Sequence, residues 1–171
     1  MTPAPENLVC FAHGKESGPW GSKITRLAEV ARARGFDVIS PDYSHTQDPK
    51  ERVWHLLDKV KPQAQRLVLV GSSMGGYVSA VACAHLKPQA LFLMAPALYF
   101  PGWDEEPLSV PRLCCVVHGW RDDIVEPERG RRFAQKHGAE LHLLNSGHTL
   151  NDQLPMLALL FDDLLARTLA S

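Results

Sequence analysis

The chain has 171 residues and a formal net charge of −1, with apolar residues at 45 % and charged residues at 22 %. This composition is typical of a folded globule that buries a sizeable core, and the length is that of one domain. The near-neutral charge argues against a general binder of nucleic acids or anionic membranes, because such proteins carry a basic excess. We therefore expect a single domain over residues 1–171 with no nucleic-acid partner.

The sequence predicts neither a leader peptide nor a membrane segment. The N-terminal stretch lacks a basic region followed by a long apolar run. The longest apolar stretch, 90–100, is interrupted by Pro96 and is much shorter than the roughly 20 residues that a membrane helix needs. The cysteines, which show no CxxC spacing, are Cys10, Cys83, Cys114 and Cys115. We expect reduced thiols, a cytoplasmic location, no membrane partner, and neither a metal nor a cofactor.

Short apolar runs alternate with helical patterns along the chain. The predicted strands span 8–13, 37–41, 66–71, 90–95, 113–118 and 140–144. Several are apolar at consecutive positions, which is typical of parallel strands that are covered on both faces. The pattern predicts βαβ units and one three-layer α/β domain.

Helical periodicity fills the segments between these strands. The predicted helices span 22–34, 49–60, 75–86, a segment from 127 onward, and 153–169. Ser22 is the expected N-cap of the first helix and Gly35 its end. Asp152 is the expected N-cap of the last helix, which leaves Pro155 in the first turn, where proline is tolerated.

The segment GSSMGG at 71–76 follows a predicted strand and opens a predicted helix. Its outer glycines have P-loop spacing, but Tyr77 and Val78 stand where Lys and Ser/Thr are required. A dinucleotide-binding loop is excluded because Ser73 replaces the second glycine of GxGxxG. The segment does match G-x-S-x-G, a sharp strand-to-helix turn that presents one reactive serine between small neighbours. We predict Ser73 as the nucleophile.

A nucleophilic serine needs a base, and the base needs an acid to orient it. In this type of turn the acid and then the histidine follow the serine along the chain. The histidines excluded by position or predicted element are His13, His45, His55, His85, His118, His137 and His142. His148, in a loop between a predicted strand and a predicted helix, remains as the base. Asp122 and Asp123 follow the fifth strand, and the spacing alone leaves both open as the acid.

A tetrahedral intermediate also needs two backbone N–H donors. Met74, directly after the nucleophile, is one expected donor. Lys15 is the other, from the glycine-containing loop after the first predicted strand. His13 in the same loop is expected to have a structural role.

Together these motifs resemble those of the α/β-hydrolase family. They are HGK at 13–15, GSSMGG at 71–76, HGWRDDIV at 118–125 and SGHTL at 146–150, in the family's order. In the family the acid occupies the D of H-G-x-x-D-x-x-V, which falls on Asp122, with Asp123 as the fallback. The resemblance implies a six-stranded, mostly parallel, doubly wound sheet of order 2-1-3-4-5-6, with the site where the order reverses between strands 1 and 3.

The chain differs from larger members of the family in two respects. It begins at the equivalent of their third strand, and it has only the 96–111 loop where they insert a helical cap. It is therefore similar to the small, lidless, bacterial-type serine hydrolases. It is less similar to the dienelactone-hydrolase group, in which cysteine often replaces the nucleophilic serine.

We expect Ser73 to cleave a small ester or thioester through an acyl-enzyme, with His148 as base and Asp122 as the orienting acid. The aromatic residues expected to form an apolar wall, which Met74 could extend, are Trp20, Tyr99, Phe100 and Trp103. The candidates to meet an anionic leaving group are Lys15, Arg121 and His45. An amidase or acyltransferase would use the same triad, and a non-catalytic binding protein could keep the same fold. The sequence does not indicate an oligomeric state.

Overall fold

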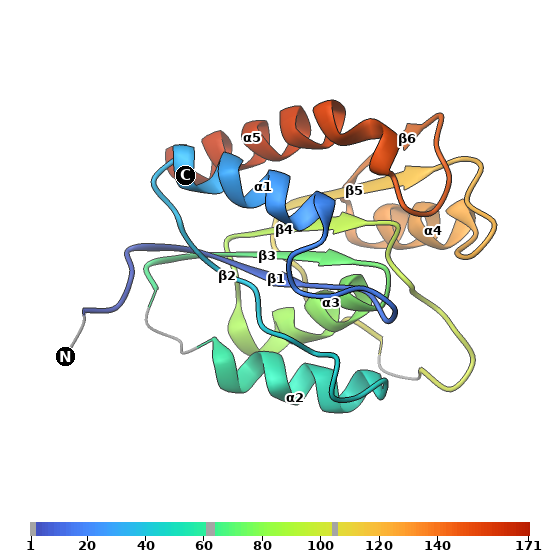
Figure 1. Ribbon diagram of the computed structural model, residues 1–171, viewed down its shortest axis with the longest axis horizontal. Coiled ribbons are helices and arrows are strands. Elements are labelled where there is room, and N and C mark those ends of the chain that lie inside the picture. Colours follow the sequence, from blue (N-terminus) through green and yellow to red (C-terminus); the bar gives the residue numbers. More distant parts are fainter. Residues whose placement is uncertain (1–2, 61–63, 104–105) are drawn as a thin grey trace.

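The computed structural model describes residues 3–60, 64–103 and 106–171, so residues 104–105 of the predicted 96–111 loop lie outside the described part. The strands are β1 Asn7–Ala12, β2 Asp37–Ile39, β3 Arg66–Ser72, β4 Ala90–Met94, β5 Leu113–Gly119 and β6 Glu140–Leu144. They form one sheet of order β2-β1-β3-β4-β5-β6 in which every neighbouring pair is parallel (Figure 1). The predicted strand order is confirmed.

Helices cover both faces of this sheet. They are α1 Ser22–Ala33, α2 Pro49–Lys59, α3 Met74–Leu86, α4 Pro127–His137 and α5 Leu154–Ala170. Helices α1 and α5 lie on one face, and α2, α3 and α4 lie on the other (Figure 1). This is the predicted three-layer arrangement, with a hydrophobic cluster on each side of the sheet.

The central strands read as continuous apolar runs because both of their faces are buried. In β3, Leu67 and Leu69 point into the cluster on the α2 and α3 side, whereas Val68 and Val70 point into the cluster on the α1 and α5 side. Successive strand residues point to opposite faces, so two covered faces require apolar residues at every position. This burial holds the C-terminal ends of β1, β3 and β5 in fixed positions.

Three details of the predicted elements were wrong. The edge strand β2 ends at Ile39, two residues before Pro41, rather than at residue 41; Pro41 has no N–H to donate to a ladder. Gly21, not Ser22, is the N-cap of α1, and no side chain caps that helix. The third error concerns the start of α5.

A short 3₁₀ turn, Asn151–Gln153, precedes α5, so Gln153 rather than Asp152 is its N-cap. The Asp152 carboxylate instead accepts a hydrogen bond from the Ser146 hydroxyl, which holds the loop before the helix. Pro155 lies in the first turn of α5, as predicted.

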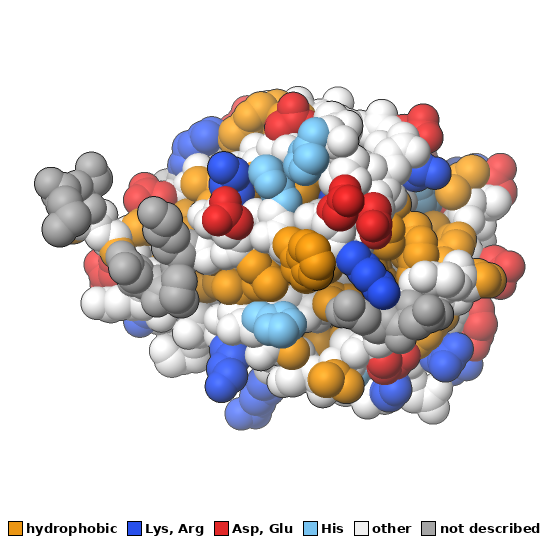
Figure 2. Space-filling view, turned by 90° about the horizontal axis from the view of Figure 1, so that it is seen from below, with side chains coloured by type: hydrophobic (Ala, Val, Ile, Leu, Met, Phe, Trp, Pro, Cys, Tyr) orange, Lys and Arg blue, Asp and Glu red, His pale blue; other side chains and the backbone are white. Residues whose placement is uncertain are grey.

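The four cysteines are free and buried. Burial raises the pKa of the Cys10, Cys114 and Cys115 thiols to about 12, so these groups are protonated near neutral pH. None of the described helices is long and apolar enough to cross a membrane. Viewed from below, hydrophobic patches are interspersed with acidic and basic side chains (Figure 2).

Candidate functional site

The predicted site residues gather where the strands end. Ser73 follows β3, Gly14 and Lys15 follow β1, Asp122 follows β5 and His148 follows β6. Parallel strands bring their carboxyl ends to one edge of the sheet, and β1 and β3 flank the point where the strand order reverses. The topology therefore brings together residues that are far apart in the sequence.

Ser73 occupies a strained turn between β3 and α3. Its backbone has φ 53° and ψ −118°, a combination that non-glycine residues rarely adopt. A Cβ on Gly71 would lie 2.2 Å from the Gly75 carbonyl oxygen, and a Cβ on Gly75 would lie 1.9 Å from the Ala12 carbonyl oxygen. Only glycine fits at both positions, and the tight packing holds the serine at the sheet edge.

Three side chains form a hydrogen-bonded chain across this edge. His148 Nε2 lies 3.1 Å from Ser73 Oγ, and His148 Nδ1 lies 2.8 Å from Asp122 Oδ2. The Asp122 side chain is fully buried, whereas 19 % of the His148 side chain is exposed. Because Nδ1 faces a carboxylate it carries the imidazole proton, which leaves Nε2 free to accept the proton of the serine hydroxyl.

The structure distinguishes the two aspartates that the sequence left open. Asp122 Oδ1 accepts hydrogen bonds from the Ile124 N–H at 2.9 Å and the Val125 N–H at 2.8 Å, which leaves Oδ2 for His148. Asp123 is exposed to solvent. Asp122 is therefore the carboxylate that contacts the histidine.

His118, which the sequence argument set aside, lies behind Asp122. Its Nε2 is 3.1 Å from Asp122 Oδ2 and 2.9 Å from the Val125 carbonyl oxygen. Both partners are acceptors, so Nε2 carries the proton, and burial lowers the pKa of the ring so that it stays neutral. A Cβ on Gly130 would come within 2.8 Å of His118 Nδ1, so this glycine leaves room for the ring. The pair His118-Gly119, shortly before Asp122, is the sequence feature from which the position of His118 beside Asp122 could have been predicted.

The loop that carries His148 is fixed on both sides. Ser146 is buried and its hydroxyl donates to Asp152, while Lys23 Nζ donates to the Thr149 carbonyl oxygen at 2.6 Å. Leu150 is fully buried in a left-handed conformation with φ 56°. The imidazole therefore projects from a well-anchored segment.

The loop after β1 is held by a buried arginine that sequence analysis missed. Arg52 of α2 is 1 % exposed, and its Nη1 donates to the carbonyl oxygens of His13 at 3.3 Å and Gly14 at 3.1 Å. His13 Nε2 accepts from the Tyr43 N–H at 2.9 Å, so Nδ1 carries the proton and donates to the Gly14 carbonyl oxygen at 2.8 Å. His13 thus shapes the loop and does not face the serine, in agreement with the structural role expected of it.

A cavity of about 650 Å³ opens beside Ser73 and His148. Met74, Phe100 and Trp103 are among the residues that line it. Neither of the other two aromatic candidates, Trp20 and Tyr99, belongs to the described lining. Trp20 is half exposed near the Arg32 guanidinium, and Tyr99, in a left-handed turn with φ 60°, packs under Arg132 of α4.

The three residues expected to meet an anionic leaving group lie in different surroundings in the structure. Lys15 lines the cavity. Arg121 instead donates to Asn145 at 2.9 Å, and the His45 ring packs against the His55 ring at a tilt of 60°, with 4.7 Å between centroids. Lys23 also lines the cavity, although sequence analysis did not select it. Its position at the start of α1, directly after the loop that follows β1, is the sequence feature from which this could have been predicted.

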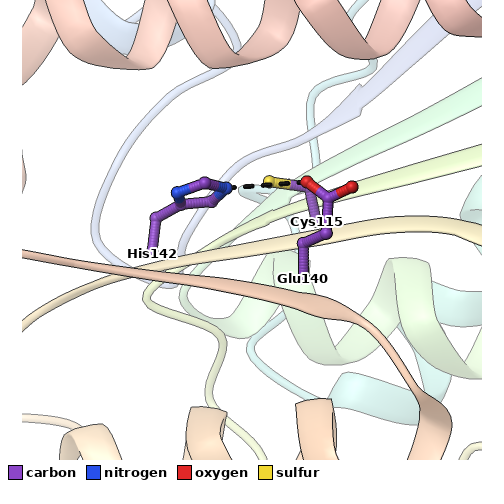
Figure 3. Close-up of side chains that lie close together, drawn as sticks. All are labelled: Cys115, Glu140 and His142. Atoms are coloured by element: carbon purple, nitrogen blue, oxygen red, sulfur yellow. Dashed lines mark ion pairs between the residues drawn. The ribbon is translucent and has the colours of Figure 1, made fainter.

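Away from this site, Cys115, Glu140 and His142 gather beneath α5 (Figure 3). Their potential metal-ligating atoms lie within 4.8 Å of one another. However, Arg167 donates to both carboxylate oxygens of Glu140, at 2.6 and 3.2 Å, and a metal would have to displace it. The Cys115 thiol, whose pKa burial raises to about 12, would also have to lose its proton. The group is better described as an ion-pair cluster.

Comparison with known families identifies the chain. The model of the α/β-hydrolase family matches residues 11–169. The chain belongs to the α/β-hydrolase family. A solved Xanthomonas campestris protein of the same superfamily is 30 % identical to this α/β hydrolase, with a TM-score of 0.86, and the match covers 94 % of this chain and 99 % of the other.

Two other solved structures show the same fold at lower identity. A Xanthomonas campestris serine hydrolase without a lid is 24 % identical with a TM-score of 0.68, and the match covers 96 % of this chain and 84 % of the other. Est1E from Butyrivibrio proteoclasticus is 16 % identical with a TM-score of 0.80, covering 99 % of this chain and 90 % of the other. A comparison with curated protein sequences finds no match.

Proposed function

We propose that this α/β hydrolase is a serine hydrolase that cleaves small carboxylic esters or thioesters through an acyl-enzyme on Ser73. The observation that carries the proposal is the chain from Ser73 Oγ through His148 to Asp122, with contacts of 3.1 and 2.8 Å. A hydroxyl in contact with an oriented imidazole is the arrangement that activates a serine for attack on a carbonyl carbon.

In the proposed reaction, Ser73 Oγ attacks the carbonyl carbon while His148 Nε2 takes the hydroxyl proton. Asp122 holds the ring by its Nδ1–H and stabilises the imidazolium that forms. His148 then gives the proton to the leaving alcohol or thiol, and the acyl-enzyme remains. A water molecule repeats the sequence with His148 as base, which releases the carboxylic acid and restores Ser73.

Backbone geometry supports Lys15 and Met74 as the oxyanion donors. The Gly14 carbonyl oxygen is directed at His13 Nδ1 and Arg52. The Lys15 N–H belongs to the same trans peptide unit, so it points the opposite way. Met74 begins α3, where the first N–H groups have no acceptor within the helix. Two such donors near the serine would stabilise the tetrahedral oxyanion.

The cavity supports a small substrate with an apolar part. Phe100 and Trp103 form an aromatic wall in a space of about 650 Å³, and their rings lie 5.3 Å apart between centroids. One structure of the fold relative Est1E has ferulic acid bound. An acyl or alcohol group of short to medium length would fit against this wall.

The test is the loss of activity and of covalent labelling in Ser73→Ala. The parent should hydrolyse 4-nitrophenyl acetate and react with a fluorophosphonate probe, and the variant should lose several orders of magnitude in rate and all labelling. Ser109→Ala, which changes an exposed serine, is the matched control and should behave like the parent.

Two results would contradict this proposal. A folded Ser73→Ala protein with near-parent turnover would rule out Ser73 as the nucleophile. A parent that neither labels nor turns over esters, thioesters or amides would point to a binding protein. Amide turnover or acyl transfer that is lost in Ser73→Ala would keep the nucleophile and change the substrate class.

A further inference from the structure

The active-site cavity contains a lysine that has no acidic partner among the described residues. Lys23 is partly buried in the first turn of α1, and its Nζ donates to the Thr149 carbonyl oxygen at 2.6 Å. Among the described residues, no carboxylate oxygen lies within 4.0 Å of its ammonium group, and burial lowers its pKa. A charge that is partly withdrawn from water without a counter-ion is unfavourable.

The position of Lys23 in its helix adds to this unfavourable energy. The N-terminal end of a helix carries a partial positive charge, so an ammonium group in the first turn is repelled. The first turn of α1 contains no acidic residue that would offset it. Holding the Thr149 carbonyl oxygen needs only a hydrogen-bond donor, and a neutral donor would suffice. The positive charge itself therefore needs another explanation.

Lys23 also borders a second space beside the nucleophile. A side cavity of about 180 Å³ shares Ser17, Lys23, Ser72 and Thr149 with the main cavity. No aspartate or glutamate is among the described residues that line this side cavity. Glu16 does line the main cavity, but it is exposed at the loop surface and forms no ion pair with Lys23. The side cavity therefore offers a positive charge with hydroxyl groups, and its described lining contains no competing carboxylate.

The main cavity has different chemistry on the two sides of Ser73. β3 lies between β1 and β4 in the sheet. The segments after β1 and at the start of α1 contribute Lys15, Ser17 and Lys23 to the lining, whereas the segment after β4 contributes Ala97, Phe100 and Trp103. A substrate whose carbonyl carbon lies at Ser73 would extend one end toward the lysines and the other toward the aromatic wall.

We propose that the substrate is an ester or thioester that carries a free carboxylate, bound by Lys23, on one side of the cleaved bond and an apolar group on the other. The inference rests on the proposed hydrolase function and specifies its substrate class. The substrate is then either a half-ester of a dicarboxylic acid or the ester of a hydroxy acid.

Paired esters that differ in this charge test the proposal. Mono-4-nitrophenyl glutarate is compared with 4-nitrophenyl butyrate for the acyl side, and 4-acetoxybenzoate with phenyl acetate for the leaving-group side. Lys23→Met should lower kcat/KM about tenfold to a hundredfold for the charged member of one pair, the loss expected for one charge-assisted hydrogen bond. The neutral members should lose only what the missing hydrogen bond to the Thr149 carbonyl oxygen costs, so their rates should fall several-fold less than those of the charged members.

Arg26→Met is the matched control. It removes a positive charge from the same helix at a position that pairs with Glu29 on the surface, and it should leave all four rates near those of the parent. An equal loss on charged and neutral esters in Lys23→Met would show that Lys23 only holds the His148 loop, and would overturn the proposal. Unchanged rates on both charged esters in Lys23→Met would overturn it as well.

A binding measurement separates this inference from the proposed function. Glutarate and 4-acetoxybenzoate are titrated calorimetrically into Ser73→Ala and into the double variant with Lys23→Met. Weaker binding of either anion in the double variant supports the carboxylate subsite even if the parent hydrolyses no ester. Equal binding in both variants, together with esterase activity in the parent, overturns the subsite and leaves the proposed function intact.

Discussion

His118 and Asp122 form a buried pair behind the candidate base: His118 Nε2 lies 3.1 Å from Asp122 Oδ2, and both side chains are fully buried. The same carboxylate oxygen lies 2.8 Å from His148 Nδ1. Asp122 is thus held by donors on two sides, and its position relative to His148 depends on all of them. A carboxylate fixed in this way needs little reorganisation when an imidazolium forms.

Replacing His118 should slow the chemical step. His118→Phe removes the donor behind Asp122 and leaves the Val125 carbonyl oxygen without its partner. We expect kcat for 4-nitrophenyl acetate to fall about tenfold with KM nearly unchanged, because His118 positions Asp122 and does not line the cavity. His118→Gln, which keeps an N–H donor, should recover part of the loss. Equal kcat values for His118→Phe and the parent would contradict this role.

The two neighbouring aspartates provide a matched pair. Asp122→Asn removes the charge that orients His148 and should lower kcat about 10³-fold to 10⁴-fold, as in other serine hydrolases with a triad. Asp123→Asn changes an exposed side chain and should stay within about twofold of the parent. Steady-state rates of both variants decide the assignment, and a reversed order of effects would favour Asp123 as the acid.

Gly75→Ala should destabilise the protein. The added Cβ would lie 1.9 Å from the Ala12 carbonyl oxygen and would force α3 away from β1. We expect a loss of about 3 kcal/mol or more in the free energy of unfolding, measured in urea. Gly18→Ala is the control, because nothing lies within 4 Å of its Cβ position, and it should change stability by less than about 0.5 kcal/mol. Equal stability of the two variants would refute the packing argument.

Arg52→Met should loosen the loop that carries Lys15. Its guanidinium binds the carbonyl oxygens of Thr46, His13 and Gly14, and methionine would remove all three of these hydrogen bonds. The free energy of unfolding should fall by about 2–4 kcal/mol, and esterase kcat should fall as well because the oxyanion donor moves. Arg26→Met, at a surface ion pair, should change neither quantity measurably. A stable Arg52→Met protein with the kcat of the parent would show that Arg52 does not hold the Lys15 loop in its active position.

Stability should decrease on mild acidification. Burial lowers the pKa of His118 and of His13 in the folded protein below the usual histidine value of 6.5. Just below pH 6.5 the unfolded chain therefore binds more protons than the folded protein, so the free energy of unfolding falls as pH falls. Each histidine contributes at most about 1.4 kcal/mol per pH unit in this window.

Urea denaturation between pH 5 and pH 8 checks this prediction. His118→Gln, which cannot titrate, should show a shallower dependence on pH than the parent below pH 6.5. An identical slope in the two proteins would mean that His118 takes up its proton without opposing folding.

Much of the fold, and the turn at Ser73, could be predicted because the sequence patterns that indicate them involve residues close together in the chain. Continuous apolar runs indicated buried parallel strands, and the glycines around Ser73 indicated a turn too tight for any larger residue. In the structure, His148 lies between that serine and Asp122, with contacts of 3.1 and 2.8 Å. Helix and strand periodicity depends on near neighbours in the chain, which is why these features can be read from it.

Only the tertiary structure decided what surrounds the serine. Lys23 and Thr149 are 126 residues apart and meet because α1 and the β6–α5 loop share one face of the sheet. Tyr99, which the sequence suggested for the cavity wall, lies in a left-handed turn and packs against Arg132 of α4 instead. The sequence determined which residues carry reactive groups and in what order they occur. Side-chain direction and charge environment, which arise from packing between distant segments, determined which of them face the cavity.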